Sequence, residues 1–205
     1  MGRFKIKKQD VYIDMTAMSD VTVLLLTFFM LTSTFIKPEP VKVNTPGSVS
    51  DIKIPESNII TILIESNGRV FLSMDKKGDL MSVLDQMQDK YGVSFNSAEK
   101  RAFGLSPAFG VPMAQMKAFL DLPEEEQTAY LKSSANPGVP CDSLHNEFKD
   151  WIKCARDVNP DLRIAIKADA KSPYKIIKNV MNSLQDIKEN RYTLITSLKV
   201  RNKID

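Results

Sequence analysis

The chain has 205 residues, of which 43% are hydrophobic and 26% charged, a composition typical of a folded protein with one ordinary domain and a short extra segment. Its net charge is +3, and after residue 50 Lys and Arg are interleaved with Asp and Glu, which argues against a nucleic-acid-binding protein. Two cysteines and one histidine are too few for a disulfide scaffold or a zinc site.

Residues 1–12 form a basic tail ahead of a long apolar segment, residues 13–36. As a helix this segment is about 36 Å long, enough to cross a hydrocarbon core of about 30 Å, so we expect a transmembrane helix. Positive charges that flank a span stay in the cytoplasm, which predicts a cytoplasmic tail and places residues 37–205 on the far side. The cations of the tail are Arg3, Lys5, Lys7 and Lys8.

The apolar segment has features of an uncleaved anchor. A signal peptide has a shorter apolar core and small residues before its cleavage site. Here "TSTFIKPEP" follows the apolar core, with bulky Phe35 and Ile36 where small residues would be needed. We therefore interpret the segment as an anchor rather than a signal peptide.

Asp20 lies inside the predicted span, where an ionised carboxylate costs roughly 2.5 to 3.5 kcal/mol and needs partners, water or a function. On a helix it shares one face with Thr16, Thr27 and Thr34. The alternative is that Asp20 reaches water at the cytoplasmic end, as Asp14 would at the helix start. Since Asp20 is roughly 10 Å further in and its side chain is short, we favour a functional group that can load and release a proton.

Residues 37–58, "KPEPVKVNTPGSVSDIKIPESN", contain four prolines and few bulky side chains, which predicts an extended linker. Within it "VKVN" alternates apolar and polar residues, as a short edge strand would. A solvated tether is an equally good interpretation of this stretch in the resting state.

Residues 59–205 are expected to form an α+β domain that opens with a hairpin and a helix. In "IITILIESNGRVFLSM", Asn67 and Gly68 tolerate the positive φ of a tight primed turn, which predicts the hairpin. The stretch "GDLMSVLDQMQDKYG" then predicts an amphipathic helix that ends at Gly92. Its core-facing residues are Leu80, Val83, Leu84 and Met87.

Residues 93–140 are expected to be helical. Pro112 and Pro123 each fit the first turn of a short helix, which predicts two helices. The acidic residues 124–126 are interpreted as a solvated helix start rather than a metal site, because consecutive helical side chains point in different directions.

The remaining stretches complete the predicted sheet. A helix over residues 142–157 is followed by the strand "RIAIKA", a helix with Ser172 as N-cap and Pro173 at its first position, and the closing strand "RYTLITSL". The order predicts a small mixed sheet with helices on one face. A helix over 142–157 would separate Cys141 and Cys154 by about 20 Å, which predicts two buried thiols; a disulfide would require the helix to begin later.

Three stretches together resemble the ExbD/TolR family, the single-pass subunits of proton-driven inner-membrane motors. "IDMTAMSDVTVLLLTFFMLTS" is similar to the family's transmembrane signature, "VKVNTPGS" to its segment just outside the bilayer, and "IAIKADAKSPYKIIKNVMNSLQ" to its strand and helix. The resemblance covers residues 1 to about 75 and about 142 to 198. Shorter members of the family lack residues 93–140, which implies that this segment is a helical insertion into the domain. The chain departs from the family in having Ala17 where Pro is common and Thr45 where Leu is usual.

The resemblance implies roles for particular residues. Asp20 corresponds to the proton-carrying residue of the family, and Thr27 to a polar position that related motor subunits also use. The segment just outside the bilayer would pair with a partner chain. Its residues are Val41, Lys42, Val43, Asn44 and Pro46.

The resemblance also implies a bacterial inner-membrane protein whose folded domain lies in the periplasm. It would assemble as a dimer inside a pentameric ring of a multi-pass ExbB-like partner and pass motion to a TonB-like protein that energises outer-membrane transport. We expect no enzyme activity, metal or cofactor, because the sequence suggests no nucleophile and base, phosphate loop or metal cage. The alternative is a TolR-like membrane-tethered module that binds the cell wall, with Asp20 as an assembly contact.

Overall fold

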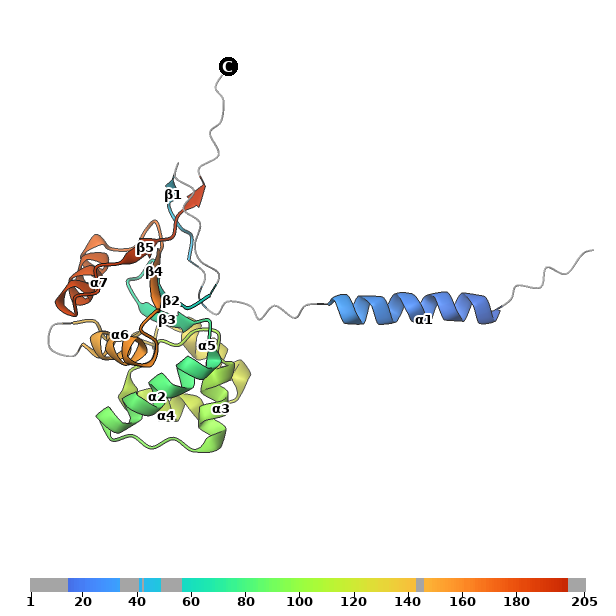
Figure 1. Cartoon of the computed structure of the whole chain (residues 1–205), viewed down its shortest axis with the longest axis horizontal. Helices are drawn as coiled ribbons and strands as arrows, with labels where there is room; N and C mark the ends of the chain where they lie inside the picture. The colour runs from blue at the N-terminus through green and yellow to red at the C-terminus, as the bar shows by residue number, and fades with distance from the viewer. Residues whose placement is uncertain (1–14, 34–40, 42, 49–56, 143–145, 199–205) are drawn as a thin grey trace, which may run out of the picture. The chain divides into compact units, whose positions relative to one another are not determined.

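The computed structural model describes residues 15–33, 41, 43–48, 57–142 and 146–198. The chain divides into two units, Met1–Pro38 and Glu39–Asp205. In the first unit the described element is one helix, α1 (Met15–Thr32) (Figure 1). The tail 1–12 and both ends of the predicted span 13–36 lie outside the described residues.

Within the part of the chain that the structure describes, no helix combines the length and the apolar character needed to cross a membrane. The transmembrane span over residues 13–36 stays a prediction.

The second unit is built on a four-stranded mixed sheet in the order β3-β2-β4-β5. Strands β2 (Ile59–Ile64) and β3 (Val70–Met74) pair antiparallel, which confirms the predicted hairpin. Strand β4 (Arg163–Ala168) lies parallel to β2, and β5 (Tyr192–Leu194) lies parallel to β4. The predicted α+β fold with a small mixed sheet is confirmed at this level.

Three helices follow the hydrophobic pattern read from the sequence. Helix α2 (Lys77–Tyr91) ends at Gly92, whose φ of 66° is the left-handed conformation expected of a glycine cap. Helices α6 (Glu147–Val158) and α7 (Tyr174–Asp186) precede β4 and β5. The connections from β2 to β4 and from β4 to β5 both lead in the same direction across the sheet. Because crossovers between parallel strands are right-handed, their helices lie on the same face of the sheet. Helices α6 and α7 accordingly lie side by side on that face (Figure 1).

Residues 93–140 contain three described helices rather than the predicted two: α3 (Ser97–Leu105), α4 (Met113–Leu120) and α5 (Glu124–Lys132). The sequence prediction missed α3, which is started by a capping box. The side chain of Asn96 accepts from the amide of Glu99 at 2.9 Å, and the Glu99 carboxylate accepts from the amide of Asn96 at 2.7 Å. Pro112 and Pro123 stand at the N-cap, one position earlier than predicted.

This helical segment is joined to the outer edge of the sheet at β3. The amide of Leu72 donates to the carbonyl of Phe109 at 2.7 Å, the amide of Phe109 donates back at 2.8 Å, and Val139 donates to Val70. A Cβ on Gly110 would lie 2.1 Å from the Phe71 ring, so the chain approaches β3 closely. Residues 93–140 therefore cover the edge that β3 would otherwise expose.

The core continues from the sheet into this segment. The buried ring of Trp151 on α6 lies 4.7 Å from the ring of Phe109 and 6.1 Å from that of Phe103, measured between centroids. Both of these aromatic neighbours of Trp151 come from residues 93–140. The three rings make one aromatic cluster that ties α6 to that segment.

Four local predictions are corrected by the structure. In the hairpin turn only Gly68 has a positive φ, 87°, so Asn67 and Gly68 do not form a two-residue primed turn. Pro173, not Ser172, is the N-cap of α7, and the Ser172 hydroxyl donates to the carbonyl of Glu65 at 2.9 Å. The helix predicted from residue 142 begins at Glu147. The closing strand is split into β5 and β6 (Ser197–Leu198), because β6 leaves the main sheet to pair with β1 (Gly47–Ser48).

Candidate functional site

Helix α1 carries the predicted proton-carrying residue. Asp20 is exposed on the described helix and forms no hydrogen bond or ion pair with the described residues. Thr16 and Thr27 lie on the same face by helical spacing. Thr34, the fourth residue of the predicted polar face, lies outside the described residues.

The threonine hydroxyls of α1 bond to their own helix. Thr27 donates to the carbonyl of Leu24 at 3.0 Å, Thr22 to that of Met18 at 2.7 Å, and Thr32 to that of Phe28 at 2.8 Å. Hydroxyls satisfied in this way are tolerated in apolar surroundings. The carboxylate of Asp20 has no such internal partner.

The rest of the α1 surface is apolar. Ten of its side chains are 55–87% exposed on the described helix: Met18, Val21, Val23, Leu24, Leu25, Leu26, Phe28, Phe29, Met30 and Leu31. A contiguous surface of this kind marks a site of contact with lipid or with another protein. Asp20 is therefore the single ionisable group of α1, on a helix whose exposed side chains are mostly apolar.

The predicted partner-pairing segment is docked on its own domain. Val41 is buried, at 1% exposure, and Val43 packs against the core. The amide of Asn44 donates to Oδ2 of Asp169 at 2.9 Å, and the amide of Ala170 donates to the carbonyl of Asn44 at 2.9 Å. We call residues 41 and 43–48 the docked segment.

The docked segment ends in the strand pair with the C-terminal part of the chain. Gly47 pairs in parallel with Ser197, and Ser48 with Leu198. Lys42 lies outside the described residues, and Pro46 is exposed. The docked segment is not the solvated tether that was one of the two interpretations, since it contacts both the end of β4 and β6.

Asp169 is the residue that holds this arrangement. It follows β4 directly, its own amide donates to the carbonyl of Ile64 at 2.9 Å, and Oδ1 accepts from the amide of Lys171 at 2.9 Å. The backbone amides of Lys171 and Asn44 stabilise the carboxylate and lower its pKa from the ordinary value. The sequence offered no signal for this contact, because it joins residues that are 125 positions apart.

The cysteines are unpaired. Cys154 is buried, as expected, whereas Cys141, which was also expected to be buried, is half-buried in the stretch before α6. Burial is the main cause that raises the pKa of both thiols. Among the described residues, no group of three or more His, Cys, Asp or Glu side chains is placed to hold a metal ion.

Comparison with known proteins gives a match over nearly the whole chain. The family model described as biopolymer transport protein ExbD/TolR matches residues 7–199. The chain is also 30% identical over 67 residues to the biopolymer transport protein exbD2 of Vibrio cholerae serotype O1. That alignment covers 33% of this chain and 50% of the Vibrio protein, so the chain spans about half the length of this curated relative. No solved structure matches the chain significantly.

Proposed function

Because the chain belongs to the ExbD/TolR family of biopolymer transport proteins, we propose that it is the ExbD-like subunit of an inner-membrane proton-channel motor. The motor would convert the proton motive force into energy for TonB-dependent outer-membrane transport, with Asp20 as the residue that carries the proton.

The observation that carries this proposal is the carboxylate of Asp20, which has no partner among the described residues and lies on the apolar helix α1. Retaining an ionisable side chain in a membrane span costs roughly 2.5 to 3.5 kcal/mol and calls for a function. Moving one charge through 100 mV supplies about 2.3 kcal/mol, which is of the same size. A carboxylate that is alternately charged and neutral can therefore couple proton passage to motion of the helix.

In this proposal α1 is part of a single membrane span, with the N-terminus in the cytoplasm and residues 37–205 in the periplasm. The apolar surface of α1 would face lipid and the helices of an ExbB-like ring, and the polar face with Thr16 and Thr27 would face a wet path or a second copy of the chain. These partners are proposed from the family alone.

The docked segment gives the proposed motor a transmitting part. Residues 41–48 follow α1 in the chain, so motion of α1 would be transmitted to them before the rest of the domain. To pair with a partner through its backbone, Asn44 must release the carboxylate of Asp169 and the amide of Ala170. We therefore propose that the docked form is the resting state and that work done on α1 frees the segment for a partner chain.

The test of this proposal is the substitution Asp20→Asn, which keeps the shape of the side chain and removes its proton chemistry. It should preserve co-purification with the ring partner and abolish uptake of a TonB-dependent substrate. Asp14→Asn, which removes a carboxylate six positions earlier, is the matched control and should leave uptake intact. Full uptake by the Asp20→Asn variant would contradict the proposal.

The second candidate function is that of a TolR-like tether to the cell wall. It is favoured by a hollow of 380 Å³ between α6 and α7, lined by Asn146, Asn179, Asn182 and other polar residues. Amide side chains both donate and accept hydrogen bonds, as recognition of a hydroxyl-rich glycan requires. Co-sedimentation with purified cell-wall sacculi that is lost in an Asn179→Ala/Asn182→Ala variant, together with normal uptake by Asp20→Asn, would favour this function.

A further inference from the structure

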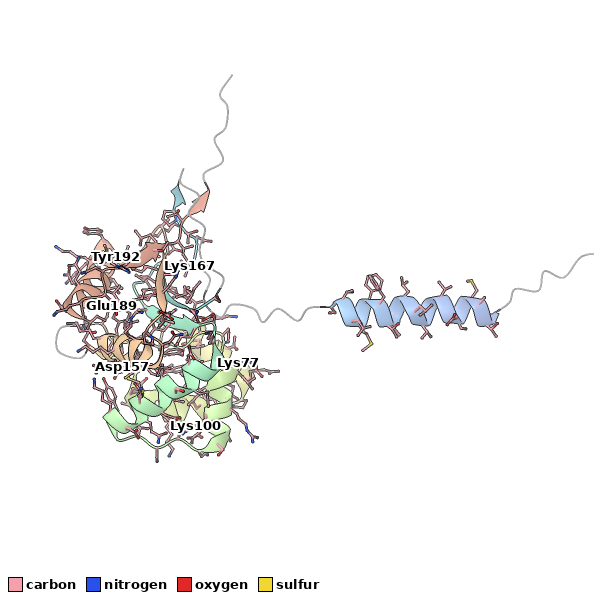
Figure 2. The ribbon with its side chains drawn as sticks, in the orientation of Figure 1. Lys77, Lys100, Asp157, Lys167, Glu189 and Tyr192 are labelled. Atoms are coloured by element: carbon pink, nitrogen blue, oxygen red, sulfur yellow. The ribbon has the colours of Figure 1, made fainter. Side chains whose placement is uncertain are left out.

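A hollow of 920 Å³ in the folded unit lies where the strands β2, β4 and β5 begin. Its walls come from the residues before β2, the turn between α6 and β4, and the turn between α7 and β5. Figure 2 labels Glu189 and Tyr192 on the last of these walls. We call this hollow the basic cleft. Its lining includes Asn58, Arg156, Arg163, Lys188, Arg191 and Tyr192.

Arg156 fixes the walls of the basic cleft relative to one another. Its guanidinium bonds to both carboxylate oxygens of Glu189, at 2.7 and 2.6 Å, and donates to the carbonyls of Pro160 and Leu162 at 2.6 and 2.7 Å. This bidentate pair joins α6 to the turn after α7, and both side chains are largely shielded from solvent. Arg156 and Glu189 neutralise each other and make the cleft a rigid structure.

The other charges of the basic cleft are not balanced. Arg163, Lys188 and Arg191 line it, and among the described residues none of the three forms an ion pair. The remaining acid in the lining is Asp161, which forms no ion pair with described residues either. Three cations and one carboxylate therefore line the same hollow. A bound anion would reduce the repulsion among the three cations.

The backbone of the cleft is also unusual. Asn58, with φ 59°, and Lys188, with φ 62°, are the two non-glycine residues with positive φ among those described, and both line the basic cleft. Asn adopts this conformation readily, but Lys has a steric cost. At Asn58 the carbonyl accepts from the amide of Arg163 at 2.8 Å, which links the entry of β2 to the entry of β4. The conformation thus holds two walls of the cleft in place.

We propose that the basic cleft binds a multiply charged oxyanion, the phosphate group of a lipid headgroup or of a soluble organic phosphate. Two guanidinium groups can each hold a phosphate through paired N–H donors, and Lys188 adds a third positive charge. Tyr192 and Thr193 on β5 supply hydroxyl donors in the same lining. The volume lies within the range of pockets that hold small ligands.

The test uses the full-length chain in nanodiscs of neutral lipid, with inorganic pyrophosphate as the probe and titration calorimetry as the readout. We expect saturable binding that weakens about tenfold or more in an Arg163→Gln/Arg191→Gln variant. The matched control is Lys153→Gln/Lys175→Gln, which removes two exposed charges of α6 and α7 outside the cleft. It should change the Kd by less than about twofold, since these two charges do not line the cleft and salt screens them from a ligand bound there.

Two further arms complete the test. If the double arginine variant does not fold, as judged by Trp151 fluorescence, Lys188→Gln replaces it and should weaken binding in the same direction. Nanodiscs that contain phosphatidylglycerol should weaken pyrophosphate binding by competition if the natural ligand is a lipid headgroup. They should leave pyrophosphate binding unchanged if the natural ligand is a soluble organic phosphate. Either result supports an anion site in the basic cleft. No saturable binding by the wild-type chain, or equal loss in the arginine variant and the lysine control, would overturn the proposal.

Discussion

Replacing Phe109 with Ala tests whether residues 93–140 are part of the domain core. Phe109 is 2% exposed, and its ring lies 5.0 Å from that of Phe103 and 4.7 Å from that of Trp151, between centroids. Removing a buried Phe ring costs about 3 to 5 kcal/mol, and the lost aromatic pairs place this site in the upper half of that range. The backbone bonds of Phe109 to Leu72 survive the change. We expect a loss of about 4 kcal/mol and a Tm lower by about 10 °C.

The assay is a urea titration of the full chain in detergent micelles, followed by the fluorescence of Trp151 and by circular dichroism. Trp151 is the single tryptophan of the chain and touches the substituted ring. The control is Leu105→Ala, at a residue of the same segment that is 47% exposed, and it should cost less than about 1 kcal/mol. A loss of less than about 1 kcal/mol for Phe109→Ala, or a fluorescence transition that precedes the loss of helix signal, would refute a shared core.

Three further outcomes concern packing and the docked segment. Gly110→Ala should lower the free energy of unfolding by about 3 kcal/mol or more, because the new Cβ would lie 2.1 Å from the Phe71 ring, whereas Gly78→Ala, with nothing within 4 Å, should not destabilise in a urea titration. Folding lowers the pKa of Asp169, so its ionised carboxylate adds to the free energy of unfolding. This contribution is full above the ordinary pKa of 3.8 and is lost as pH falls through the folded-state pKa. In the Asp169→Asn variant the free energy of unfolding, measured as a function of pH, should lack this loss at low pH. The same pH dependence in the variant and the wild-type chain would contradict the role of Asp169. Hydrogen exchange at the Asn44 amide should be slow in the wild-type chain and fast in Asp169→Ala, and equal protection in both would contradict the docking.

The parts of the fold that could be predicted from the sequence are those set by local pattern. Two β-rich runs between Ile59 and Met74 flank a turn with glycine, and Leu80, Val83, Leu84 and Met87 recur at helical spacing before Gly92. Both patterns became the elements predicted, because the buried face of each is specified within a few residues. The error in the turn also has a local cause, since Asn67 has a negative φ and its side chain instead accepts from the amide of Arg69 at 3.2 Å.

Other features could not be predicted because they depend on distant residues. The docking of Asn44 on Asp169 and the pairing of Gly47 with Ser197 join the beginning and the end of the second unit. Periodicity carries no information on such contacts. Helix α3 is different: the capping box of Asn96 and Glu99 was visible in the sequence and was missed, because the apolar spacing after it is weak over so short a helix.

For the candidate site, the sequence identified Asp20 and the segment from Val41 to Pro46, but not the residue that holds that segment. Asp169 was read only as part of a family-like stretch after a strand. The basic cleft was missed for the same reason: Arg163 and Arg191 are far apart in the chain and come together only through the parallel pairing of β4 and β5.

The protonation of Asp20 is the central claim, and infrared difference spectroscopy measures it most directly. The full chain would be reconstituted with its ring partner and examined as the pH is lowered, with Asp14→Asn as control. The account predicts a band of a protonated carboxyl group that appears in the wild-type chain and in Asp14→Asn and is missing in Asp20→Asn. Identical spectra for the wild-type chain and Asp20→Asn would contradict it.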